Sequence, residues 1–168
     1  MNERESWLTA LGEGEIHAAL APVFAALPPE IALEALVVHR PAGAAASKAV
    51  EAAILTPALK GNTAVASALW LYVDELDLSH TLSQALHSPT GSYLHGIMHR
   101  REGDFGNSLY WMSQTGSHPV WGQIPNFNPR GFIRAVEARS SGDNDDLVAL
   151  QRMEWNTLFH HILRYGAQ

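Results

Sequence analysis

The stretch SYLHGIMHRREGD, residues 92–104, decides the fold class because it reads as one complete helix and the start of another. Gly103 is the residue type that most often ends a helix in the left-handed conformation. Asp104, directly after it, is a residue type that caps the first turn of a following helix. The stretch therefore predicts a helix over residues 92–102, a tight turn, and a second helix that begins near residue 104.

Helical patterns continue on both sides of this stretch. Residues 63–87 are the clearest periodic segment, with a bend expected near Leu78 because Ser79 could cap a second helix there. Further helices are predicted at residues 15–26, 44–54, 104–116, 130–139 and from Asp146 onward.

The segments between these helices carry few strand signals. Residues 30–38 could form a helix or a short strand, and the proline-rich residues 118–129 predict an ordered loop. Residues 140–145 predict a flexible polar turn. We therefore expect one all-α domain over residues 1–168, a bundle of about five to eight helices.

Composition excludes several classes of function. The 168 residues contain no cysteine, which excludes disulfides, thiol nucleophiles and cysteine-ligated metals. The formal charge of −6, with scattered basic residues, argues against a nucleic-acid partner. The sequence shows no apolar run long enough for a membrane span, no signal peptide over its first residues and no glycine-rich nucleotide loop. We expect a cytoplasmic protein without nucleotide or flavin.

Three histidines and a glutamate form the leading candidate site. In a helix, spacings of four and three residues place His95, His99 and Glu102 on one face. Neutral imidazoles four residues apart can chelate one divalent ion, and His80 on the preceding helix could complete the set. We expect these four residues to be the metal ligands, with Asp77 or Asp104 as a catalytic base toward a metal-bound water.

Two other interpretations remain open. A small polar or anionic ligand could be bound by Arg100 together with an aromatic, proline-rich segment that contributes Tyr110, Trp111 and His118. The same histidines, arginines and acids could instead form a purely structural brace, in which ion pairs position neighbouring helices. The aromatic loop is also a candidate homodimer face.

Residues 68–121 resemble a family of small bacterial and fungal proteins that has no assigned activity. The family's core is similar to HGxMHRREGDxxNxxYW followed by a GxHP turn, which matches residues 95–111 and 116–119 here. The upstream LYVDELDLSH, residues 71–80, is similar as well. The resemblance makes this segment the motif-bearing core of the chain but implies no mechanism.

Two further resemblances are narrower. Residues 103–112, GDFGNSLYWM, look like one helix of a Sel1 or tetratricopeptide unit, which implies a helical interaction module, although no second copy occurs. His80 with the His95-x-x-x-His99-Arg100 segment looks like the metal-binding pattern of DinB-like bundles. The expected function is thus binding of a metal ion or small polar ligand, with hydrolase or lyase chemistry open, and a non-catalytic interaction module as the alternative.

Overall fold

The computed structural model describes residue 7, residues 14–139 and residues 144–168 of the chain. Within these residues it contains eight α-helices, one 3₁₀ helix and no strand, which confirms the all-α prediction. The turn predicted at residues 140–145 lies largely on residues 140–143, which are outside the described residues. The prediction about a signal peptide concerns the first residues of the chain, which are also outside them. The elements are α2 (Glu15–Ala26), α3 (Ala44–Ile54), α4 (Thr63–Tyr72), α5 (Leu76–Ser83), α6 (Pro89–Glu102), α7 (Phe105–Thr115), η1 (Pro119–Gln123), α8 (Pro129–Ala138) and α9 (Asp145–Tyr165).

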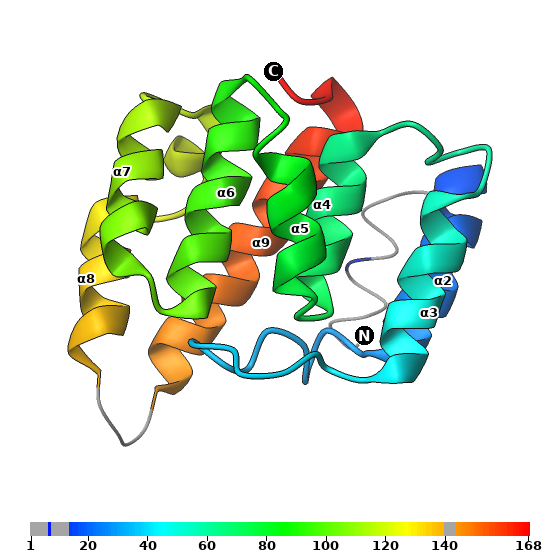
Figure 1. Cartoon of the computed structure of the whole chain (residues 1–168), viewed down its shortest axis with the longest axis horizontal. Helices are drawn as coiled ribbons and strands as arrows, with labels where there is room; N and C mark the ends of the chain where they lie inside the picture. Colours follow the sequence, from blue (N-terminus) through cyan, green and yellow to red (C-terminus); the bar gives the residue numbers. More distant parts are fainter. Residues whose placement is uncertain (1–6, 8–13, 140–143) are drawn as a thin grey trace.

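Helices that follow one another in the chain mostly pack side by side. Contacts join α2 to α3, α4 to α5, α5 to α6, α6 to α7 and α7 to α8. The long α9 passes behind the middle of the row and contacts α4, η1 and α8 (Figure 1). Because α5, α6 and α7 are consecutive neighbours, the motif-bearing segment of the sequence forms one continuous part of the bundle.

The turn between α6 and α7 has the predicted chemistry. Gly103 ends α6 in the left-handed conformation with a φ of 87°, where a residue with a side chain would be strained. The side chain of Asp104 accepts a hydrogen bond from the backbone N–H of Asn107 and caps α7. Both predictions are confirmed. The helix before this turn is longer than expected, since Ser88 caps it and it begins at Pro89.

The bend in the 63–87 segment lies earlier than the sequence suggests. The helix stops at Tyr72, and Asp74 adopts the left-handed conformation with a φ of 63°. The reason is long-range: Arg101 of α6 contacts the Asp74 carboxylate at 2.7 Å and donates a hydrogen bond to the Leu71 carbonyl at the end of α4. Ser79 is therefore no helix cap; it is buried within α5.

Residues 27–43 form neither the helix nor the strand considered for residues 30–38. Three carbonyl groups in this irregular segment accept hydrogen bonds from side chains of α6 and α9. From α9, Arg152 donates to the Ala32 carbonyl, and Gln151 donates to those of Leu33 and Ala35. From α6, Arg101 also donates to the Ala35 carbonyl. Side chains thus satisfy backbone groups that secondary structure would otherwise pair.

The hydrophobic core is rich in aromatic rings where α9 meets α4. Trp155 packs against Phe159, with ring centroids 4.6 Å apart, and against Tyr72 at 4.8 Å. Phe24 of α2 and Trp7 join the same cluster. None of the described helices combines the length and the apolarity that crossing a lipid bilayer requires.

Candidate metal centre

Three of the predicted histidines converge. His80 comes from α5, while His95 and His99 lie one turn apart on α6. Each ring offers one nitrogen, and these nitrogens all lie within 4.8 Å of one another. The centroid of His95 is 4.7 Å from those of His80 and His99, and His80 and His99 are 5.5 Å apart. This is a buried histidine cluster that could hold a metal ion.

Burial keeps His95 uncharged near neutral pH. His95 and His99 are only 3% and 8% exposed, and His80 is half-buried. Desolvation, followed by the nearby His99 and His80, lowers the pKa of His95 from 6.5 to about 4. A neutral imidazole is the form that binds metals, so no proton has to leave His95 at pH 7.

Hydrogen bonds to Nδ1 orient two of the three rings. The Nδ1 of His99 lies 2.5 Å from a carboxylate oxygen of Glu102, which only accepts, so Nδ1 carries the proton. The Nδ1 of His95 lies 3.2 Å from the hydroxyl of Ser83, which itself donates to the His80 carbonyl and therefore accepts from His95. In the neutral form of each ring, the form that binds a metal, the unprotonated nitrogen is then Nε2.

Trp111 forms one wall of the cluster. Its ring lies 4.2 Å from that of His95, centroid to centroid, and it is half-buried. Tyr110, predicted to act beside it, is 54% exposed and contacts Trp111 edge-on at 5.5 Å. Trp111 thus lies at the histidines, whereas Tyr110 faces solvent on the outer side of α7.

The predicted acids are divided between two places. Glu102 and Asp104 form a second group with His99, in which the ligand atoms also lie within 4.8 Å of one another. The Asp104 carboxylate accepts hydrogen bonds from the backbone and side-chain N–H groups of Asn107, which lower its pKa. Asp77 lies exposed in the first turn of α5, outside both groups of potential ligands in the described part of the chain.

Arg100, predicted as a ligand-binding residue, lies in the core. Its guanidinium is fully buried, contacts the Glu154 carboxylate at 2.6 Å and lies over the ring of Phe132. The adjacent Arg101 is equally buried and pairs with Asp74. The two arginines therefore join α6 to α9 and to the end of α4, and they point away from the histidines.

His118, also predicted as a ligand-binding residue, belongs to a different cluster. Its Nδ1 accepts a hydrogen bond from the Val120 N–H, so its Nε2 donates to the Thr90 hydroxyl. Its ring also contacts those of Tyr93 and His161. The structure thus places His118 beside the first turn of α6, on a separate site from His80.

Sequence reasoning missed the roles of Ser83 and Glu154. Ser83 follows His80 by three residues, so helical spacing places both on one face of α5 and gives a usable signal. Glu154 lies 54 residues from Arg100, and no local pattern connects the two.

Comparison with known proteins finds no similarity on which to draw: no family model matches the chain, and neither does any curated protein or solved structure. The resemblance of residues 68–121 to small bacterial and fungal proteins stays a prediction.

Proposed function

We propose that the protein binds one divalent transition-metal ion through His80, His95 and His99, and that this centre is the basis of its function. One observation carries the proposal: two helices bring a nitrogen from each of three imidazoles within 4.8 Å of one another. Three histidines that surround a single ion form a common protein site for zinc.

The hydrogen bonds around the rings support the proposal. Metal-binding histidines usually donate their second ring nitrogen to a carboxylate or another acceptor, which fixes the tautomer and the ring plane. Glu102 does this for His99, and Ser83 does it for His95. The two Nε2 atoms are then free to coordinate the same ion.

Three imidazoles leave a coordination position open, which suits catalysis. A zinc-bound water has a pKa of roughly 7 and supplies hydroxide for hydrolysis or for a lyase reaction. Asp104 is the predicted base that the structure groups with His99. Its two hydrogen bonds from Asn107 keep it ionised and weaken it as a base, so metal binding is the better supported part of the proposal.

A structural brace is the second candidate, and the arginines favour it. Arg100 and Arg101 are buried and paired with acids on other elements, as a brace requires. In that case the histidines only fill space between α5 and α6, and the protein takes up no metal.

Zinc content after equilibrium dialysis separates the two candidates. His95→Asn and His99→Asn keep a polar atom near the Nδ1 position and remove Nε2, so Ser83 and Glu102 retain a partner. We expect about one zinc per chain in the wild type and almost none in either variant, with unchanged far-UV circular dichroism. His87→Gln, an exposed histidine just beyond α5, is the matched control and keeps its zinc. Wild-type protein without zinc, or variants that retain it, would contradict the proposal.

A further inference from the structure

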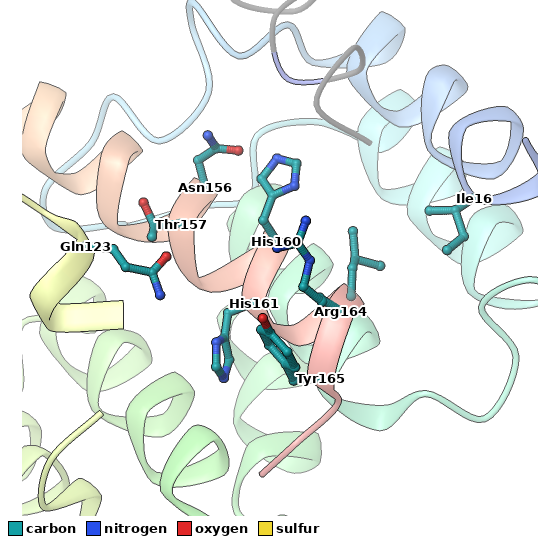
Figure 2. Close-up of a pocket in the computed structure, with 9 residues that line it drawn as sticks. Ile16, Gln123, Asn156, Thr157, His160, His161, Arg164 and Tyr165 are labelled. Carbon is teal, nitrogen blue, oxygen red and sulfur yellow. The ribbon is translucent and has the colours of Figure 1, made fainter. Parts of the chain in front are cut away.

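A polar pocket, separate from the histidine cluster, lies on the face of α9 that turns toward α2 and η1. It has a volume of about 730 Å³ and none of the three clustered histidines lines it. Figure 2 shows that α9 supplies most of its lining, with Gln123 of η1 and Ile16 of α2 on opposite sides. Residues four apart on α9, such as Asn156, His160 and Arg164, line it in a row because they share one helix face.

Arg164 is the one side chain in the lining of this pocket that carries a formal charge at neutral pH. Its lining contains Arg164 and two histidines but no aspartate or glutamate, although the whole chain has a net charge of −6. Among the described residues, none of the ion pairs involves Arg164, an exposed side chain whose guanidinium lies 6.0 Å from the centroid of the Tyr165 ring. An arginine without a carboxylate partner, at the mouth of a polar hollow, is suited to bind an anion.

Two of the residues that line this pocket each carry a buried polar atom without a partner. The Oδ1 of Asn156 and the Nδ1 of His161 have no hydrogen-bond partner in the structure, although solvent hardly reaches either atom. Buried polar atoms are nearly always paired, so rotation of either side chain toward the pocket would allow it to pair with a ligand there. Thr157 donates its hydroxyl proton to the Met153 carbonyl, so its oxygen is left to accept a further hydrogen bond.

We propose that this pocket binds a small anion with a carboxylate or phosphate group, held by Arg164 and His160. Burial, followed by the nearby Arg164, lowers the pKa of His160, and the negative charge of a bound anion would act in the opposite direction by favouring the protonated ring. This site is independent of the proposed metal centre, because it uses different residues on a different helix.

Titration of the full-length, metal-free protein with inorganic phosphate and with succinate tests the proposal. Nuclear magnetic resonance follows the backbone amides of residues 156–165 and the ring protons of His160, with those of His95 as an internal reference. We expect saturable shifts around the pocket and none at His95. Tighter binding of succinate would assign a carboxylate ligand, and tighter binding of phosphate would assign a phosphorylated one.

Arg164→Gln and His160→Gln are the test variants, and Arg134→Gln on α8 is the control, since that arginine is exposed and outside the pocket. Loss of one charge-assisted hydrogen bond should weaken binding by about tenfold in each test variant and leave the control unchanged. No saturable shift with either anion, or equal affinity in wild type and Arg164→Gln, would overturn the proposal.

Discussion

The guanidinium of Arg100 and the carboxylate of Glu154 meet at 2.6 Å, and both side chains are removed from solvent. Glu154 also accepts a hydrogen bond from the hydroxyl of Tyr93, which lies two residues before His95 on α6. The pair therefore fixes how α6 is rotated against α9. That rotation determines where His95 and His99 point, so a structural contact in the core positions the candidate metal ligands.

Removing the Glu154 charge should destabilise the fold strongly. In Glu154→Gln the Arg100 guanidinium stays buried without a counter-charge, which costs about 3–5 kcal/mol in comparable pairs. Urea unfolding measures this loss. Glu137→Gln, an exposed glutamate on α8, is the control and should change the free energy of unfolding by no more than about 0.5 kcal/mol. Equal stability of the two variants would show that the buried pair does not hold α6 in place.

The close approach of α6 to the end of the preceding turn predicts a glycine requirement. A Cβ added at Gly91 would overlap the backbone carbonyl of Leu86, which cannot move aside as a flexible side chain can. We expect Gly91→Ala to cost about 1–3 kcal/mol or more by thermal unfolding. Gly122→Ala, where no atom lies within 4 Å of the new Cβ, should be close to neutral. A Gly91→Ala protein as stable as the control would contradict the packing at this turn.

His118 should make stability depend on pH. Burial, followed by the nearby His161, lowers its pKa from 6.5 to about 4 in the folded protein. Between these two values the unfolded chain binds a proton that the folded chain does not, so stability falls as pH drops from 6.5 toward 4. Protonation of Nδ1 would also break the hydrogen bond that His118 accepts from the Val120 N–H.

The slope contributed by His118 is at most about 1.4 kcal/mol per pH unit. Urea unfolding of wild type and His118→Asn at a series of pH values within this window measures it, since asparagine can still accept from Val120 but does not titrate. We expect a shallower slope in the variant, while His95 contributes equally to both proteins. Parallel pH profiles would show that His118 titrates normally.

Glu102 should tune the metal centre without forming it. Its carboxylate accepts a hydrogen bond from the Nδ1–H of His99, and loss of such a contact typically weakens metal binding by about 10–100-fold. Isothermal titration with zinc should therefore show weaker but intact binding in Glu102→Gln, and unchanged binding in Glu137→Gln. Unaltered affinity in Glu102→Gln would mean that this contact does not orient the ring.

Local sequence signals predicted the helices and the turn chemistry well. Gly103 and Asp104 act within one turn of their own positions, so their residue types were sufficient to place the boundary between α6 and α7. The spacing of His95 and His99 was equally local. The pairing of α5 with α6 followed from the short turn between them, and it brought His80 to the other two histidines.

Features set by distant residues could not be predicted. The break after Tyr72 depends on Arg101 of α6, and the burial of Arg100 depends on Glu154 of α9. Adjacent arginines in a sequence more often face solvent. Only the packed structure shows that this pair is buried in the core, where it contacts carboxylates and donates to backbone carbonyls. For the same reason, the pocket around Arg164 has no signature in the sequence beyond a face of the last helix that carries His160 and Arg164, four residues apart.

X-ray absorption spectroscopy of the zinc-loaded protein tests the central claim most directly, because it reports the atoms bound to the ion. The proposed centre predicts nitrogen ligands at roughly 2.0–2.1 Å with the outer-shell scattering of about three imidazole rings. That imidazole signal should decrease in His95→Asn. A zinc ion surrounded by oxygen atoms alone, with no imidazole scattering, would contradict coordination by His80, His95 and His99.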